Sequence, residues 1–214
     1  MSDSFDQVNL VVRTIAETAV DNEKYFGDLD AVVGDGDFGY SMARGFEVVL
    51  ADWDGIDRTD IATFLKKVAV TITGRIGGTS GPIWGTAFLR AGVTLGDNAE
   101  PSGEDVIAAL RASIEGVKQR GQTDLGDKTL LDALVPAVDE LEKALAEGAP
   151  DALTRAAATC REAADNTKGM LAQRGRASYT GERSRDSVDA GAVGVAVMLE
   201  DVSKAWQEAG LERA

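Results

Sequence analysis

The chain has 214 residues, 44% of them hydrophobic, and its 36 acidic and 22 basic side chains give a formal net charge of −14. This length predicts one domain with a sizeable core, spanning residues 1–214, and the lack of a basic stripe argues against nucleic acid as a partner. The chain has no histidine and one cysteine, Cys160, which excludes an internal disulfide, a cysteine-based metal site and histidine general-base chemistry within this subunit. No apolar run reaches the roughly 18 residues of a membrane span, and the N-terminus lacks signal-peptide features, so we expect a cytoplasmic protein with no membrane partner.

Helical periodicity recurs along the whole chain, without strand-like alternation, a linker or an internal repeat. It predicts eight helices, at about 4–26, 37–51, 59–76, 80–95, 102–121, 131–145, 151–174 and 191–211. We expect Thr59 to cap the third helix, Pro82 to lie in the first turn of the fourth, and Pro136 to kink the sixth. The sequence therefore predicts an all-α fold whose informative polar and glycine residues lie between helices.

Three carboxylates, Asp30, Asp35 and Asp37, lie between the first two predicted helices. Like charges this close repel one another, and a divalent cation would remove that cost. All-oxygen ligands favour Mg²⁺ or Ca²⁺, but a calcium loop counted from Asp35 would place Phe46 where a bidentate glutamate is needed. The spacing therefore predicts Mg²⁺ shared with a phosphate.

The same segment also matches G-x-G-x-x-G through Gly34, Gly36 and Gly39. Its two aspartates would repel a pyrophosphate held directly on the backbone, and the preceding apolar run is short for a strand. An Asp/Gly turn that caps the next helix is an equally good interpretation of the pair Asp35 and Asp37 taken alone. The third carboxylate, Asp30, favours the metal site.

A glycine- and hydroxyl-rich connection, Gly74–Pro82, opens the fourth predicted helix. Exposed backbone N–H groups, the Thr79 and Ser80 hydroxyls and the positive end of the helix dipole suit an anion. A glycine C-cap followed by a Ser/Thr N-cap would explain the same residues without a ligand.

Two later connections have polar motifs. The stretch Gly121–Thr129 imitates a Walker A loop, but Asp127 stands between its glycine and lysine and it follows a helix, so we reject a P-loop and leave open that it lines a nucleotide pocket. The segment Gly175–Ser184 is long for a helix connection, and Arg176 or Arg183 could clamp a phosphate there. Alternatively, both arginines only offset the acidic surface.

Four motifs, in the order Gly34–Gly39, Gly77–Pro82, Gly126–Thr129 and Gly175–Ser184, resemble the nucleotide-binding L subunit (DhaL family) of dihydroxyacetone kinases. The resemblance covers the chain from Asp30 to Gly191. It implies a single-domain barrel of eight antiparallel helices with the nucleotide site in the loops at one end.

The resemblance also implies roles for individual residues. Asp30, Asp35 and Asp37 would be the magnesium ligands, Gly78, Thr79 and Ser80 would hold phosphates, and Gly121 and Leu130 would flank the adenine. The full set of expected nucleotide contacts is Phe38, Gly39, Ser41, Gly78, Thr79, Ser80, Gly121, Leu130, Arg176, Asp189, Ala190 and Gly191.

The sequence departs from the family pattern at two places. Phe38 stands where the family motif has histidine, and the final turn, Val188–Gly191, lacks the usual histidine and proline. The metal ligands are intact, so nucleotide binding is expected to survive. The departures suggest a divergent branch acting on a related small ketose.

In function, the resemblance implies a kinase subunit that holds ADP or ATP with Mg²⁺ while a separate K subunit binds dihydroxyacetone or a similar ketose. ATP is then either consumed, or ADP stays bound and is rephosphorylated by a phosphocarrier protein of the phosphoenolpyruvate system; self-association into a homodimer is left open. One alternative is a catalytically inactive, ADP-binding regulatory protein with the same fold. Another, a helical interaction module whose acidic loop binds nothing, would need neither the carboxylates nor the phosphate loops.

Overall fold

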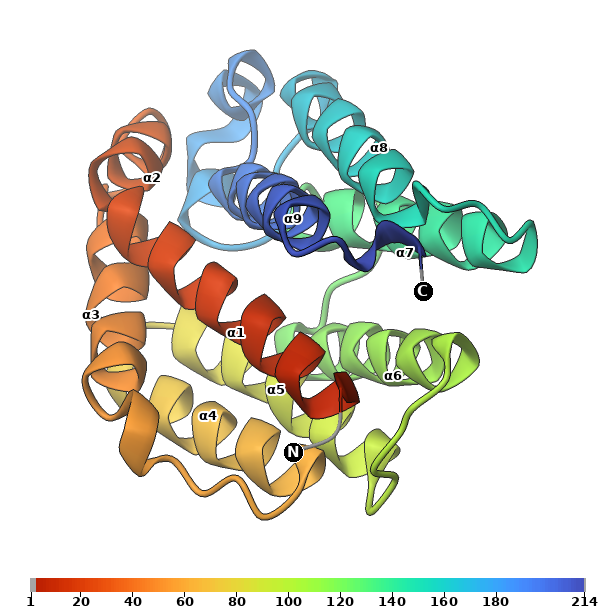
Figure 1. Cartoon of the computed structure of the whole chain (residues 1–214). Helices are drawn as coiled ribbons and strands as arrows, with labels where there is room; N and C mark the ends of the chain where they lie inside the picture. The colour runs from red at the N-terminus through yellow and green to blue at the C-terminus, as the bar shows by residue number, and fades with distance from the viewer. Residues whose placement is uncertain (1–2, 214) are drawn as a thin grey trace.

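Nine α-helices account for most of residues 3–213, which are the residues that the computed structural model describes (Figure 1). The helices are α1 (Asp3–Asp21), α2 (Glu23–Asp30), α3 (Phe38–Ala51), α4 (Ile61–Arg75), α5 (Ser80–Leu95), α6 (Gly103–Gly121), α7 (Leu131–Ala146), α8 (Ala152–Asn166) and α9 (Ala190–Glu208). Four 3-10 segments complete the set: η1 (Trp53–Gly55), η2 (Thr167–Gly169), η3 (Arg176–Asp186) and η4 (Leu211–Arg213). No strand occurs among residues 3–213, which confirms the predicted all-α class.

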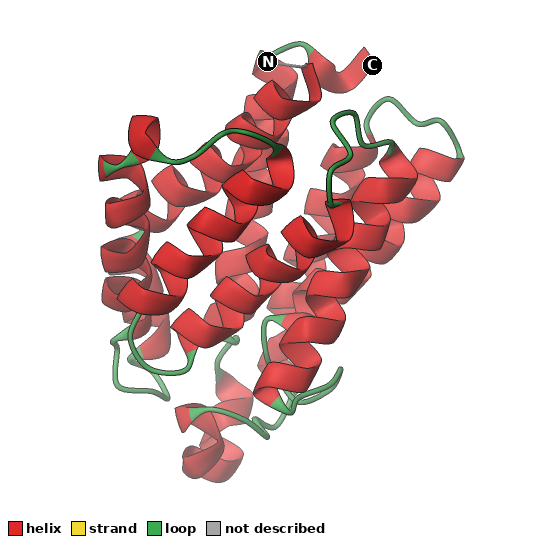
Figure 2. Cartoon of the chain, turned by 90° about the horizontal axis from the view of Figure 1, so that it is seen from below, coloured by secondary structure: helices red, strands yellow, loops and turns green. Residues whose placement is uncertain are grey.

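Eight of these helices form a closed ring. Helix α1 packs against α3, each helix from α3 to α9 packs against the next in chain order, and α9 returns to α1. Helix α2 continues from α1 and packs against α3 and α9. The helices lie side by side, with their connecting loops gathered at the two ends (Figure 2). The predicted barrel of eight helices is therefore confirmed, with α2 as an extension of its first helix.

Several predicted helix ends were wrong. The first predicted helix is interrupted at Asn22, which separates α1 from α2. Asp60, not Thr59, caps α4, because its side chain accepts a 2.6 Å hydrogen bond from the Thr63 N–H. The helix expected to reach Arg174 ends at Asn166 as α8, and the residues beyond it form an irregular loop around η3.

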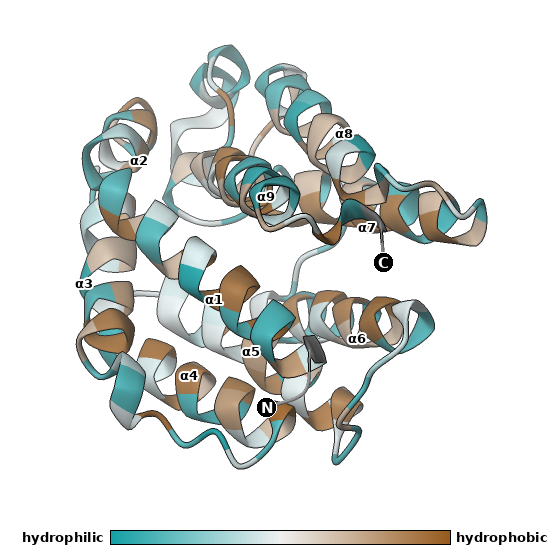
Figure 3. Ribbon diagram, viewed as in Figure 1, coloured by the Kyte–Doolittle hydropathy of each residue, from teal (hydrophilic) through white to brown (hydrophobic). Residues whose placement is uncertain are grey.

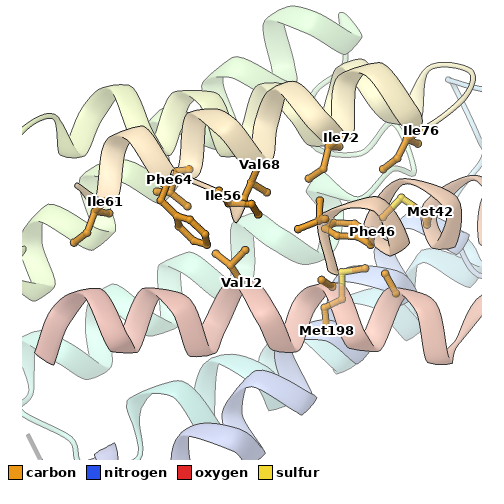
Figure 4. Packing of buried hydrophobic residues seen from close by; sticks show 14 of the residues in the cluster. Val12, Met42, Phe46, Ile56, Ile61, Phe64, Val68, Ile72, Ile76 and Met198 are labelled. Carbon is orange, nitrogen blue, oxygen red and sulfur yellow. The ribbon is translucent and has the colours of Figure 1, made fainter. Parts of the chain in front are cut away.

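The core lies inside the ring and is built from the apolar faces of amphipathic helices. Figure 3 shows hydrophobic and hydrophilic residues alternating along the helices, as the periodicity predicts. In Figure 4, Val12 of α1, Phe46 of α3, Phe64 of α4 and Met198 of α9 point toward one another. Phe46 and Phe64 are fully buried, and burying such a side chain contributes about 2–3 kcal/mol.

Cys160 belongs to a second core cluster under α7, α8 and α9. It is fully buried, and burial raises the pKa of its thiol to about 12. Cys160 therefore serves core packing, and such a thiol is un-ionised at neutral pH. Among residues 3–213, no helix combines the length and apolar character that crossing a membrane requires.

Candidate functional site

The connection between α2 and α3 brings the three predicted metal ligands together. One carboxylate oxygen each from Asp30, Asp35 and Asp37 can be chosen so that all three lie within 4.8 Å of one another. Asp30 is the last residue of α2 and Asp37 directly precedes α3, so two helix ends fix their spacing. Asp35 and Asp37 are exposed and Asp30 is half-buried. Three accessible carboxylates and no nitrogen or sulfur donor fit a hard cation such as Mg²⁺.

The geometry argues against a turn that only caps α3. Asp37 occupies the N-cap position, but its side chain accepts no capping hydrogen bond. A β-carbon added at Gly34 would lie 2.3 Å from Asp30 Oδ1, and Gly36 has a φ of 75°. The glycines therefore let the loop turn tightly around Asp30 and leave the Asp37 carboxylate available for a ligand.

Arg176 from η3 reaches this cluster from far along the chain. Its Nη1 forms an ion pair with Asp35, and its Nη2 lies 3.5 Å from Asp37 Oδ2. Partial burial, followed by the neighbouring Asp35 charge, raises the pKa of Asp37, and Arg176 opposes this rise. The cluster thus has the repulsive electrostatics expected of a cation site, together with one arginine side chain, 61% exposed, that offsets them.

The connection between α4 and α5 approaches the same region. A β-carbon added at Gly77 would lie 3.6 Å from Ser41 Oγ, in the first turns of α3. Gly78 has a φ of 62° and faces open space, and Thr79, at the N-cap of α5, makes no side-chain capping hydrogen bond. The capping alternative for this loop therefore fails as well. Its exposed groups lie at the positive end of a 16-residue helix, where an anion is favoured.

The start of α9 is held in place by hydrogen bonds around Asp189. The Asp189 carboxylate accepts a 2.7 Å hydrogen bond from the Ala192 N–H, and its own N–H donates to Thr167 Oγ1 at 2.8 Å. A β-carbon added at Gly191 would lie 3.4 Å from the Leu130 Cβ. Burial raises the pKa of Asp189 to about 7, with further rises from Asp132 and Asp30. The α9 turn at Asp189 thus lies within electrostatic reach of Asp30 in the carboxylate cluster.

Gly121 and Ala190 are two further residues that we expect to contact the nucleotide. Gly121 is the last residue of α6, and a β-carbon there would lie 3.1 Å from Ile83 in the first turn of α5. Ala190, half-buried, begins α9. The structure thus joins the predicted residues into two sets: one around Asp37, Ser41 and the α5 start, and one around Leu130 and the α9 start.

Phe38 and Gly39 begin α3 and lie against neighbouring helices. Phe38 is 9% exposed, its ring centroid lies 5.9 Å from that of Phe26, and it packs against Gly194 of α9. A β-carbon added at Gly39 would lie 1.9 Å from the Glu23 carbonyl oxygen, so this glycine permits a close crossing of α2 and α3. The structure places the Phe38 ring in the core, and its expected contact with a nucleotide stays a prediction. Only its backbone borders the site, through a long 3.4 Å hydrogen bond to Asp30.

Sequence reasoning missed Lys128, Asp132 and Ser184, which are all buried. Asp132 accepts hydrogen bonds from the Gly126 and Thr129 N–H groups, and Lys128 points away from solvent, which supports the rejection of a P-loop. A signal was present, because an irregular loop as long as 167–189 must satisfy many backbone carbonyls, and a lysine or aspartate next to a glycine turn is a candidate partner.

Fold and site together define an all-α barrel with an oxygen-only carboxylate cluster, an arginine and a glycine–hydroxyl helix start at one end. Residues 32–204 match the family model described as the DAK2 domain. The chain therefore belongs to the DAK2 domain family.

Two relatives and one solved structure show the extent of this similarity. The chain is 36% identical over 187 residues to the "PEP-dependent dihydroxyacetone kinase, ADP-binding subunit DhaL" of Escherichia coli K12, covering 86% of this chain and 89% of that protein. It is 38% identical over 192 residues to the "L-erythrulose 1-kinase" of Mycolicibacterium smegmatis, covering 89% of this chain but 34% of that protein. The dihydroxyacetone kinase of C. freundii, solved with AMP-PNP and Mg²⁺, matches with a TM-score of 0.75 and 25% identity, over 95% of this chain and 34% of that one.

Proposed function

We propose that this chain is the nucleotide-binding phosphotransferase subunit of a kinase for dihydroxyacetone or a related small ketose. In this proposal it holds ADP or ATP with Mg²⁺ and acts with a separate, substrate-binding K subunit. The observation that carries the proposal is the convergence of Asp30, Asp35 and Asp37 with Arg176 at one end of the barrel. The names of the similar kinases, with ADP-binding subunits among them, support it.

In the proposed site, Asp30, Asp35 and Asp37 hold the magnesium ion, which when bound neutralises the negative charge of the phosphate oxygens. Thr79, Ser80 and the backbone at Gly78 bind phosphates at the start of α5. Exposed hydroxyls and N–H groups at a helix N-terminus donate to such oxygens without a change of fold.

Arg176 is the residue that compensates charge in this proposal. Its guanidinium now pairs with two carboxylates, Asp35 and Asp37. When a cation takes over those carboxylates, the planar guanidinium can donate to phosphate oxygens instead, and it does so best in a bidentate contact. Gly121, Leu130 and the α9 turn at Asp189–Gly191 are proposed to flank the adenosine part.

The proposal assigns ketose binding to a partner for a chemical reason. The chain has no histidine, and the Phe38 ring, at the position where the family motif has one, is buried. The described site therefore offers no histidine to capture a ketose carbonyl, and the transferred phosphate is expected to face outward. The phosphoryl donor, ATP or a phosphocarrier protein acting on bound ADP, is a further part of the proposal, and a homodimer is compatible with it.

Calorimetry provides the first test. ADP should bind with Mg²⁺ and lose most of its affinity when EDTA replaces Mg²⁺. With a K subunit from a similar kinase and dihydroxyacetone or erythrulose, the mixture should form the sugar phosphate, whereas the chain alone should not. Binding without any transfer would instead support the alternative, a regulatory ADP-binding protein, which the loss of the family histidine at Phe38 favours. Absence of Mg²⁺-dependent ADP binding would refute both.

A further inference from the structure

The loop that delivers Arg176 to the carboxylates is fastened by one buried side chain. Lys128 is 2% exposed. Its ammonium group donates hydrogen bonds to the carbonyl oxygens of Met170, at 3.2 Å, Ser187, at 2.6 Å, and Ser184. An ammonium has three hydrogens, so all of its donors are used within the protein. Lys128 therefore has no donor left for a phosphate.

These three carbonyls lie on both sides of the Arg176 segment. Met170 precedes it, and Ser184 and Ser187 lie at and just beyond the end of η3. The Ser184 hydroxyl ties the same two ends together, accepting a hydrogen bond from the Ala172 N–H at 3.0 Å and donating one to the Gly181 carbonyl at 2.8 Å. Lys128 and Ser184 thus hold the two ends of the 170–187 loop together by hydrogen bonds.

The side chain of Lys128 is itself held in place from the other direction. The φ of Lys128 is 63°, a left-handed conformation that is rare for residues other than glycine. Buried Asp132 holds the surrounding turn through the Gly126 N–H, at 2.6 Å, and the Thr129 N–H, at 2.8 Å. A strained backbone conformation that turns a lysine into the interior is costly, and the surrounding hydrogen bonds must maintain it.

We propose that Lys128 is a positioning residue that sets the affinity for Mg²⁺–nucleotide by fixing the 170–187 loop so that Arg176 faces the carboxylate cluster. This inference rests on the proposed function. Burying an ammonium is expensive, and here that group holds both ends of the loop whose arginine reaches Asp35 and Asp37. The lysine of the Walker-A-like stretch thus acts on phosphate indirectly, through a second residue.

Lys128→Met tests this role, because methionine keeps similar length and volume but donates no hydrogen bonds. Hydrogen exchange should show the amides of Ala172 and Gln173, which donate to Ser184 Oγ and to the Asp127 carbonyl, exchanging at least about tenfold faster, with amides in α4 unchanged. The affinity for ADP with Mg²⁺ should fall about tenfold or more. Lys168→Met, the same change at an exposed lysine close to the loop, is the control and should alter neither measurement.

A double-mutant cycle separates positioning from general destabilisation. Arg176→Ala should also weaken ADP binding, and adding Lys128→Met to it should cause less than a twofold further loss. If the losses of ADP affinity in the two single mutants multiply in the double mutant, as they do for independent sites, the inference is overturned. Unchanged ADP affinity in Lys128→Met, while the wild-type chain binds, would overturn it too. Failure of the wild-type chain to bind ADP with Mg²⁺ would overturn the proposed function instead, and exchange at Ala172 would still show whether Lys128 fastens the loop.

Lys128→Met leaves three carbonyls without a partner and could prevent folding. In that case Ser184→Ala is the test variant, because it removes only one hydroxyl from the hydrogen bonds that join the ends of the loop. The same cycle with Arg176→Ala should again be non-additive, with a smaller, severalfold loss of ADP affinity in the Ser184→Ala single mutant. Additive losses in this second cycle would overturn the inference as well.

Discussion

Replacing Asp37 by asparagine is the most direct test of the carboxylate cluster. The change keeps the shape of the side chain and removes one of three charges whose oxygens lie within 4.8 Å of one another. At that distance two unit charges repel by about 0.9 kcal/mol in water and about 3.5 kcal/mol at an effective dielectric constant near 20. The Asp37 side chain is 53% exposed and Arg176 compensates part of the repulsion, so the lower figure applies. We expect Asp37→Asn to raise the free energy of unfolding of the metal-free protein by about 1 kcal/mol.

The same substitution should have the opposite effect on ligand binding. With one ligand charge removed, calorimetry should show that ADP affinity no longer depends on Mg²⁺. The raised pKa of Asp37 sets the pH dependence, because the folded protein holds this proton more tightly than the unfolded chain. The wild-type protein thus loses stability as pH rises from the ordinary pKa of an aspartate to the raised pKa of Asp37. The gain in the free energy of unfolding of Asp37→Asn should therefore be full near neutral pH and vanish in acid.

Urea unfolding in EDTA and calorimetry with ADP, with and without Mg²⁺, would measure both effects. Asp97→Asn is the control, since it removes the same charge at an exposed position outside the cluster. It should leave nucleotide binding unchanged. Undiminished, Mg²⁺-dependent ADP affinity in Asp37→Asn would refute the metal assignment. A loss of apo stability would refute the electrostatic reasoning.

Three further substitutions test other parts of the site. Phe38→His should lower the free energy of unfolding by about 2–3 kcal/mol, because it puts a polar ring into the core. The ADP affinity of the folded variant should change less than tenfold, and a larger change in calorimetry would show that residue 38 contacts the phosphates. Thr79→Ala should leave the free energy of unfolding in urea within about 0.5 kcal/mol of wild type, since the Thr79 side chain makes no capping hydrogen bond. It should weaken ADP binding about tenfold, and an unchanged affinity would remove Thr79 from the site. The pKa of Asp189, raised from 3.8 to about 7, predicts that wild-type stability falls as pH rises from about 4 to about 7, and Asp189→Asn, which can still accept the Ala192 N–H, should flatten this slope in urea unfolding at several pH values.

Much of the architecture could be predicted from local sequence signals. Amphipathic periodicity is set by spacing along one helix, so the all-α class and most helix positions followed from it. The carboxylates and the Gly77–Ser80 loop were also visible as motifs, because a metal ligand set or a helix start is encoded within a few residues. Local rules erred at helix ends, where neighbouring polar residues compete: Asp60, one residue after Thr59, captures the capping bond to Thr63.

Tertiary structure decided where the side chains of those motifs point. Phe38 turns into the core because Phe26 and Gly194 offer it an apolar surface. Lys128 turns inward because the carbonyls of a loop more than forty residues later need donors. Arg176 meets Asp35 and Asp37 although about 140 residues separate them along the chain. Each of these contacts joins residues far apart in sequence, and the energy of a buried ring, ammonium or ion pair depends on partners that the local pattern does not contain.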